Sequence, residues 1–251
     1  MGLDIDQERM PKYLFSSEDD PPLKFTTSII DATSDLVCAY KLNLAFYEVF
    51  GRNGFDLLER TVQHIPKDIV VILDGKRNDI GNTMEKYARS LFDILHADAV
   101  TINPYLGRDT VHPFLAYKDK CCFILCRTSN PSAGDFQDLS INGVPFYQVV
   151  AQKIKEWNMY GNCGAVVGAT YPDELEIIRG ILGDEIPILI PGVGKQSGSV
   201  EQSVKNGVNS QGELALINSS RDIIFAGTNR DFAEESRHAA ERLRDEMNKY
   251  R

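Results

Sequence analysis

Four charged residues follow two apolar runs of the sequence and could act on a bound anion. Lys41 ends the run 36–41, Asp74 ends the run 69–74, and Lys76 and Asp79 follow within five residues. Asp74 and Lys76 are two residues apart, so on a regular strand their side chains point to the same side. A structural salt bridge at a turn explains that pair equally well. The second lysine, Lys41, favours a site of two lysines and two aspartates.

A phosphate site is predicted near the end of the chain. The run 186–190 is followed by a glycine-rich loop that contains Pro191 and Gln196, and the run 214–218 is followed by Ser219, Ser220 and Arg221. Barrels of alternating strands and helices commonly bind phosphate at these two positions. The Arg221 guanidinium could hold a phosphate with two hydrogen bonds. The glycine loop alone is weak support, because it does not match a Walker A sequence.

Other polar residues give weaker signals. Thr128 and Ser129 follow the run 121–126, and their hydroxyls could contact a polar ring, although simple turn chemistry explains them equally well. No histidine ends a predicted strand, so His64, His96, His112 and His238 are expected at the surface. We therefore expect neither histidine-based catalysis nor a metal site.

Eight short apolar runs alternate with helix-length amphipathic segments. The runs are residues 2–5, 36–41, 69–74, 99–103, 121–126, 164–168, 186–190 and 214–218. Residues 83–95 carry apolar side chains at helical spacing, and so does a closing helix that contains Phe232 and Leu243. Strict alternation indicates a (β/α)8 barrel or a doubly wound sheet. Eight strands in 251 residues favour a (β/α)8 TIM barrel that forms one domain over residues 1–251.

Composition excludes several classes of protein. The net charge of −9 argues against nucleic-acid binding, which requires a basic surface. No apolar run reaches the roughly 18 residues of a membrane span, and residues 1–4 do not resemble a signal or transit peptide. The five cysteines lie in apolar runs without metal-type spacing, so we expect buried, reduced thiols in a cytoplasmic protein.

The segment 74–83, DGKRNDIGNT, resembles the D-x-K-x-x-D-I-x-x-T signature of orotidine 5′-phosphate decarboxylases. The resemblance extends over nearly the whole chain and is closest to the bacterial-type second subfamily. The further matching segments, in the same order as in that family, are residues 35–47, 103–108, 127–131, 167–170, 191–196 and 218–221.

The resemblance implies an activity and an assembly. The expected reaction converts orotidine 5′-monophosphate to UMP and CO2 in de novo pyrimidine biosynthesis, without metal or cofactor, in a homodimer. Lys76 would donate the proton within an array with Lys41 and Asp74, and Asp79 would enter this array from the partner subunit. The implied substrate-binding residues are Asp4, Asn43, Ile80, Thr83, Thr128, Ser129, Pro191, Gln196, Ser220 and Arg221.

The sequence departs from the family pattern at two places. Residues 195–198 read KQSG where many relatives have AQGG, and Lys195 could attract phosphate or be solvated. The chain also begins inside the first predicted strand, which leaves the closure of the barrel and the position of Asp4 open.

Two alternative functions remain open at this stage. One is a Mg²⁺-dependent sugar-phosphate lyase of the same barrel group, such as a 3-keto-gulonate-6-phosphate decarboxylase. Such lyases have an acidic residue at the position of Lys41, where a lysine would repel the cation. The other is a non-catalytic barrel that binds nucleotides.

Overall fold

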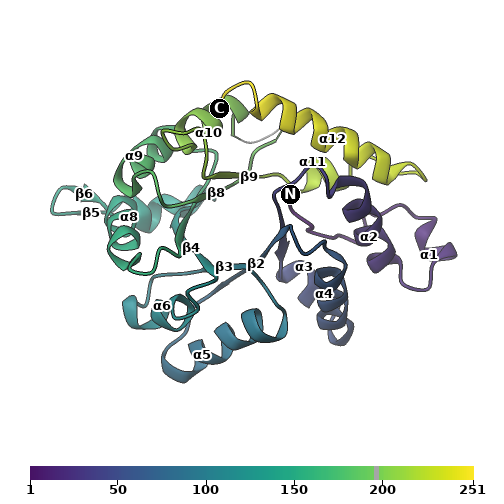
Figure 1. Ribbon diagram of the computed structural model, residues 1–251, viewed down its shortest axis with the longest axis horizontal. Coiled ribbons are helices and arrows are strands. Elements are labelled where there is room, and N and C mark those ends of the chain that lie inside the picture. Colours follow the sequence, from purple (N-terminus) through teal and green to yellow (C-terminus); the bar gives the residue numbers. More distant parts are fainter. Residues whose placement is uncertain (195–197) are drawn as a thin grey trace.

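Parallel strands form a barrel wall at the centre of the molecule, and helices surround it (Figure 1). The structure is a computed structural model that describes residues 1–194 and 198–251. Within these residues the wall is a seven-stranded sheet of order β1-β2-β3-β4-β7-β8-β9, and all its neighbouring strands are parallel. The strands are β1 Ala39–Asn43, β2 Val70–Arg77, β3 Ala99–Ile102, β4 Cys121–Arg127, β7 Cys163–Val167, β8 Ile188–Pro191 and β9 Ala215–Asn218.

Helices connect the strands on the outside of the wall, as a parallel sheet requires. They are α1 Leu14–Ser17, α2 Pro21–Thr33, α3 Ala45–Glu48, α4 Arg52–His64, α5 Gly81–Arg89, the π-helix η1 Ser90–Ile94, α6 Arg108–Leu115, the 3₁₀ helix η2 Pro131–Ala133, α7 Gly134–Gln137, α8 Phe146–Trp157, α9 Pro172–Leu182, α10 Val200–Gly207, α11 Arg221–Ile224 and α12 Phe232–Met247. The predicted (β/α)8 barrel architecture is confirmed.

The first predicted strand, residues 2–5, is reduced to a single bridge between Gly2 and Lys41. The Gly2 N–H donates to the Ser219 carbonyl at 2.8 Å, and the Leu3 N–H donates to the Lys41 carbonyl at 2.9 Å. The segment therefore occupies the eighth position of the wall and joins its last strand to its first. A side chain at position 2 would not fit, because an added Cβ would lie 2.7 Å from the Ser220 Cβ.

The boundaries of β1 and β2 differ most from the prediction. β1 begins at Ala39 and continues to Asn43, so Lys41 lies within the strand and not at its end. β2 continues past Asp74 to Arg77, with an irregularity opposite β3. The apolar residues of both strands were recognised in the sequence, but the register against the neighbouring strands decides where each strand stops.

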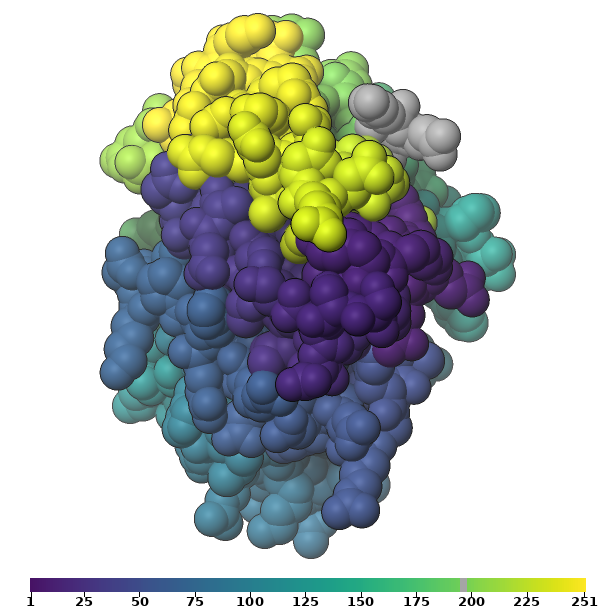
Figure 2. Space-filling view, turned by 90° about the vertical axis from the view of Figure 1, so that its right-hand side faces the viewer, coloured from purple at the N-terminus to yellow at the C-terminus, as the bar shows by residue number. Residues whose placement is uncertain are grey.

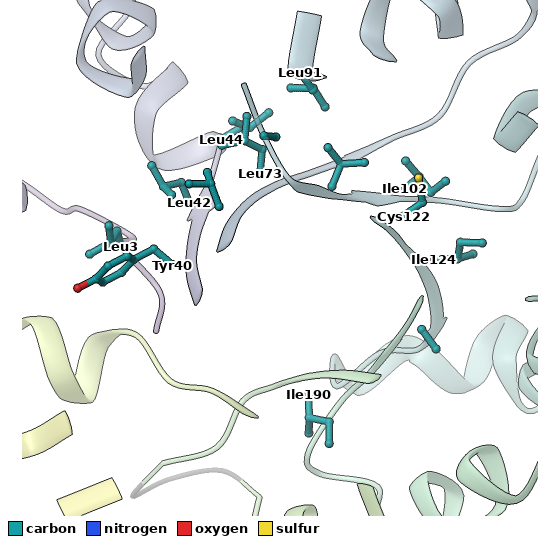
Figure 3. Packing of buried hydrophobic residues seen from close by; sticks show 14 of the residues in the cluster. Leu3, Tyr40, Leu42, Leu44, Leu73, Leu91, Ile102, Cys122, Ile124 and Ile190 are labelled. Atoms are coloured by element: carbon teal, nitrogen blue, oxygen red, sulfur yellow. The ribbon is translucent and has the colours of Figure 1, made fainter. Parts of the chain in front are cut away.

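Apolar side chains fill both sides of the wall. The interior holds Ala39, Ile72, Ala99, Phe123, Val166 and Leu189. The Phe123 ring occupies the space that a side chain at Gly164 would need, since an added Cβ would lie 2.5 Å from the ring. On the outer side, a larger cluster joins the strands to the helices. Figure 3 shows part of it, with Leu44 and Leu73 near Leu91 of η1.

The predicted helix over residues 83–95 is α5 continued by η1. It begins two residues earlier than expected and changes to a π-helix at Ser90. Its predicted apolar face is buried, including Met84, Leu91 and Phe92. The closing helix α12 packs on α2, which Figure 2 shows as the contact between the C-terminal and N-terminal parts of the chain. No helix in the described residues is long and apolar enough to cross a membrane.

A short hairpin projects between β4 and α8, and the sequence analysis overlooked it (Figure 1). Its strands are β5 Ser140–Ile141 and β6 Val144–Pro145, joined by Asn142 and Gly143. Both turn residues have positive φ, 52° and 84°. Asn-Gly is the pair that favours this type of two-residue turn, so the signal was present in the sequence.

The histidines are exposed, as expected. The five cysteines are free, but the expectation that all are buried is wrong, because Cys38 precedes β1 and is exposed. In the described part of the chain, no group of three or more His, Cys, Asp or Glu residues is arranged to hold a metal ion.

Candidate active site

Two lysines and one aspartate meet at the C-terminal edge of β1 and β2. Lys41 Nζ lies 2.9 Å from Asp74 Oδ2, and Lys76 Nζ lies 2.7 Å from Asp74 Oδ1. The side chains of Lys41 and Asp74 are 5% and 8% exposed, whereas that of Lys76 is 45% exposed. The array is thus anchored by a buried ion pair, and Lys76 is its accessible cation.

Asp4 extends the array from the N-terminal segment. Its Oδ1 lies 3.7 Å from Lys41 Nζ and is buried without a hydrogen-bond partner among the described residues. Because Leu3 still bonds to β1, the chain leaves the wall just before Asp4 and turns its carboxylate toward Lys41. Asn43 lies beside Asp74 in the strand register, and its side chain accepts the Ala45 N–H at 3.2 Å.

Asp74 and Lys76 are in contact, as their spacing predicts, but β2 is not a regular strand between them. Three residues lie between Leu73 and Arg77, whereas only one lies between their partners Val100 and Ile102 on β3. β2 therefore bulges between these points, and Lys76 has a φ of 47°. This left-handed conformation is uncommon for a residue with a side chain and persists only when its surroundings hold it.

Thr101 of β3 belongs to the array, and the sequence analysis missed it. Its hydroxyl donates to Asp74 Oδ1 at 2.7 Å and accepts the Lys76 backbone N–H at 3.0 Å. The residue is 1% exposed. Threonine is common in strands because its branched Cβ packs well there, so Thr101 does not stand out in the sequence. The one available signal was a hydroxyl within the otherwise apolar run 99–102.

The surroundings of Asp74 keep its carboxyl ionised. Burial is the largest influence and raises the pKa. The charges of Lys41 and Lys76 and the hydrogen bonds from Lys76 and Thr101 oppose burial and together lower the pKa from 3.8 to about 2. Asp74 is therefore a fixed negative charge between two lysines at neutral pH.

The loop after β2 places Asp79, Ile80 and Thr83 outside this array. Asp79 Oδ1 accepts the Ile80 N–H, and none of the ion pairs among the described residues includes Asp79. Ile80 is 63% exposed, and Thr83 lies exposed in the first turn of α5. The structure of one chain therefore does not bring these three residues to Lys76.

The segment after β4 places Thr128 and Ser129 at the same edge of the barrel. The amide of Gln137, another residue that the sequence analysis missed, accepts the Thr128 N–H at 2.9 Å and donates to its hydroxyl at 2.7 Å. Ser129 packs on the strand ends nearby, since a Cβ added at Gly168 would lie 2.7 Å from the Ser129 Cβ. Ser129 is exposed, whereas the hydroxyl of Thr128 is engaged.

A buried arginine at the end of β4 contacts residues on both sides of this segment. The Arg127 side chain is 3% exposed and lies 2.8 Å from Asp138 Oδ1. Its guanidinium carbon is 3.9 Å from the centroid of the Tyr171 ring. Arg127 therefore links the residues after β4 to the loop after β7.

The predicted phosphate-binding residues lie at the ends of β8 and β9. Pro191 is the last residue of β8, and Ser220 and Arg221 stand at the start of α11. Ser220 Oγ is buried and has no hydrogen-bond partner in the described part of the chain, and Arg221 is exposed. Gln196, together with Lys195, lies outside the described residues.

Comparisons with known proteins show which family the chain resembles. The family model "Orotidine 5′-phosphate decarboxylase / HUMPS family" matches residues 3–236. An orotidine 5′-phosphate decarboxylase of Dehalococcoides mccartyi is 45% identical over 255 residues, which cover 100% of this chain and 92% of the relative. A protein of the same name from Azoarcus sp. is 46% identical, covering 100% of this chain and 93% of the relative.

Solved structures show the same likeness. The OMP decarboxylase of Leishmania donovani matches with a TM-score of 0.82 and 35% identity, over 97% of this chain and 92% of that chain. The UMP synthase of Leishmania donovani matches with a TM-score of 0.88 and 36% identity, over 98% of this chain and 52% of that longer chain. The chain therefore belongs to the orotidine 5′-phosphate decarboxylase / HUMPS family.

Proposed function

We propose that this chain is a carboxy-lyase that converts orotidine 5′-monophosphate to UMP and CO2 without a metal ion or cofactor. The observation that carries the proposal is the contact of Lys41 and Lys76 with one buried carboxylate, Asp74, at the C-terminal edge of the barrel. Chemistry in such barrels takes place at this edge. The names and the 45–46% identity of the relatives support the substrate, and the reaction belongs to pyrimidine biosynthesis.

The reaction needs stabilisation of a negative charge on carbon. The bond between the pyrimidine ring and its carboxylate breaks, CO2 leaves, and the electron pair remains on the ring carbon. A fixed cation close to that carbon lowers the barrier most, because it is in place before the charge develops. Lys76 has the exposed ammonium of the array, and its proton is transferred to the ring carbon to form the new C–H bond.

Lys41 has a different part in this proposal. Its ammonium is buried and lies between Asp74 and Asp4, so it is too enclosed to donate a proton to the ring. It holds Asp74 from the side opposite Lys76. Asp74 in turn directs the Lys76 ammonium, and the charges of Lys41 and Asp74 stay in place when Lys76 gives up its proton.

The other end of the substrate is bound at β8 and β9. Ser220 and Arg221 contact the phosphate, together with Pro191 at the end of β8 and with Gln196. Phosphate contacts far from the reacting carbon can supply the energy that closes a loop over the site. Thr128 and Ser129 face the pyrimidine, and Asp4 and Asn43 lie at the ribose end.

The proposal includes a homodimer in which two subunits share each active site. Asp79 has no ion pair within its own chain among the described residues, although it lies three residues from Lys76. Ile80, Tyr105 and Leu106 are 63%, 70% and 45% exposed in the loops that follow β2 and β3. Large exposed apolar side chains at one edge favour a contact with a second copy. Asp79, Ile80 and Thr83 would then reach the partner's site.

Two other functions fit the array less well. A Mg²⁺-dependent sugar-phosphate lyase belongs to the same barrel group, but Lys41 Nζ lies 2.9 Å from Asp74 and would repel a cation there. A non-catalytic nucleotide-binding barrel would not need the array. Burying charged groups such as Lys41 and Asp74 costs desolvation free energy, and binding alone gives no reason to keep them.

We expect rapid formation of UMP from orotidine 5′-monophosphate by the purified chain in excess EDTA. The Lys76→Ala variant is expected to lose at least about 10²–10³-fold in kcat, the range found when one preorganised group that stabilises a transition state is removed. Lys86→Ala is the matched control, because Lys86 is an exposed lysine of α5. The measurement is UMP formation by liquid chromatography, with circular dichroism to confirm folding.

Other results would exclude the proposal. Turnover of a sugar phosphate that EDTA abolishes and Mg²⁺ restores, without formation of UMP, would favour the sugar-phosphate lyase. Stabilisation of the fold by UMP without turnover would favour the binding protein. Full activity of Lys76→Ala would retain the reaction but remove Lys76 as the proton donor.

A further inference from the structure

Among the described residues, the side-chain hydroxyl of Thr101 makes two hydrogen bonds, and both go to residues of the proposed catalytic array. The hydroxyl proton goes to Asp74 Oδ1, and the hydroxyl oxygen accepts the backbone N–H of Lys76. The residue is 1% exposed, so water does not compete with these bonds. Other buried threonines behave differently: Thr26 and Thr33 donate to carbonyls four residues earlier in their own helix.

The position of Thr101 on β3 explains why the bulge in β2 can form. Between the paired positions Leu73–Val100 and Arg77–Ile102, β3 has one residue and β2 has three. A bulge leaves backbone groups without partners in the sheet, and a buried N–H without a partner is costly. The Thr101 hydroxyl accepts the N–H of Lys76, which is the bulge residue with a φ of 47°.

The same hydroxyl also acts on the far end of Lys76. Asp74 Oδ1 accepts both the Thr101 hydroxyl and the Lys76 ammonium, each at 2.7 Å, while Lys41 bonds to Oδ2. The carboxylate is therefore held by donors from β1, β2 and β3. Thr101 reaches Lys76 twice, through its backbone directly and through its ammonium by way of Asp74.

We infer that Thr101 is a positioning residue for the decarboxylation, because its hydroxyl fixes both the left-handed backbone of Lys76 and the carboxylate that aims the Lys76 ammonium. The inference rests on the proposed function, in which Lys76 stabilises the charge and donates the proton. Thr101 itself touches neither the substrate nor the reacting atoms. Its loss should therefore affect turnover more than substrate binding.

The test compares three variants in the full-length protein. Thr101→Val keeps the shape and removes the hydroxyl, Thr101→Ser keeps the hydroxyl, and Thr26→Val removes a buried hydroxyl of α2 that is bonded only within its helix. We measure kcat and KM for orotidine 5′-monophosphate together with the melting temperature. Thr101→Val is expected to lower kcat by about tenfold or more, which corresponds to about 1.4 kcal/mol of barrier, with KM changed by less than about threefold. Thr101→Ser should keep most of the wild-type kcat, and Thr26→Val should leave kcat unchanged.

Several results would overturn the inference. They are a kcat of Thr101→Val close to that of the wild type, a loss confined to KM, an equal loss in Thr101→Ser, and an equal loss in Thr26→Val. If Thr101→Val does not fold, Thr101→Cys decides by the same criteria, because a thiol is a weak hydrogen-bond donor and acceptor of similar size. The two proposals fail separately: an inactive wild type rejects the function, whereas an active wild type with an inactive Lys76→Ala and a normal Thr101→Val rejects only this inference.

Discussion

At the scale of single residues, the two lysines of the array differ in burial although both pair with Asp74. Asp74 and Lys41 are buried and hold one another, so neither can be removed without leaving a buried charge. Lys76 shares Asp74 with Lys41 but faces the opening of the barrel. One carboxylate thus supports both a structural cation and a cation that can meet substrate, and its protonation should affect the stability of the protein.

The low pKa of Asp74 predicts a specific loss of stability in acid. Because the folded-state pKa of about 2 lies below the usual value of 3.8, ionised Asp74 stabilises the fold above about pH 4. This contribution is lost as the pH falls toward 2. We expect the difference in unfolding free energy between the wild type and Asp74→Asn to shrink by about 2 kcal/mol between pH 4 and pH 2.

Urea unfolding at a series of pH values measures this difference. Asp35→Asn is a useful comparison, because the hydrogen bond from Arg237 also lowers the pKa of Asp35, but at an exposed position. A difference between the wild type and Asp74→Asn that does not change with pH would show that Asp74 is not held ionised by its neighbours.

Some residues of the array could be predicted from the sequence and others could not. Lys41, Asp74 and Lys76 could be predicted, because charged residues at the ends of apolar runs of sequence are unusual. Thr101 could not, since its role depends on a bulge in the neighbouring strand. The place of Asp79 in a shared site rests on the resemblance and stays a prediction.

At the scale of elements, one arginine ties together the strands that carry the predicted phosphate site. Arg179 of α9 is 9% exposed and donates to the carbonyls of Gly183, Ile186, Gly207 and Leu214. These carbonyls lie at the end of α10 and before β8 and β9. They are partly or fully buried, and a side chain without donors would leave them without those bonds.

We expect Arg179→Met to lower the free energy of unfolding by about 3 kcal/mol, because several buried acceptors would lose their donor. Arg237→Met is the control of matched chemistry: Arg237 lies on α12, is 35% exposed and pairs with Asp35 on the surface. It should change the urea midpoint little, since exposed ion pairs contribute little. Equal shifts in the two midpoints would contradict the assigned role of Arg179.

Element types could be predicted more securely than element ends. The apolar runs identified every strand of the wall, and the helical spacing identified α5 and α12. The first strand became a single bridge, because Met1, Gly2 and Leu3 bond to the neighbouring segments before the chain turns toward Lys41 at Asp4. Such limits depend on register between distant segments, which the pattern of a single segment does not contain.

At the scale of the whole molecule, the proposed dimer makes the active site a property of two chains. A symmetric dimer places the same surface of each subunit on the other, so a loop that leaves one site can complete the second. The loop after β2 has the required features: Asp79 is close to Lys76 in sequence but is not paired with it, and Ile80 is exposed. The net charge of −9 does not favour association, so the contact must rest on apolar side chains.

Heterodimers of defined composition test site sharing directly. A Lys76→Ala subunit and an Asp79→Ala subunit, carrying different affinity tags and purified through both, should form dimers with about half of the wild-type activity, because one of the two shared sites keeps both residues. A wild-type subunit paired with a subunit that carries both substitutions should be nearly inactive, since each site then lacks one residue. If each subunit used its own Asp79, the first heterodimer would be inactive and the second half-active. The two heterodimers thus serve as controls for each other, and the exchange of their activities would assign Asp79 to its own subunit.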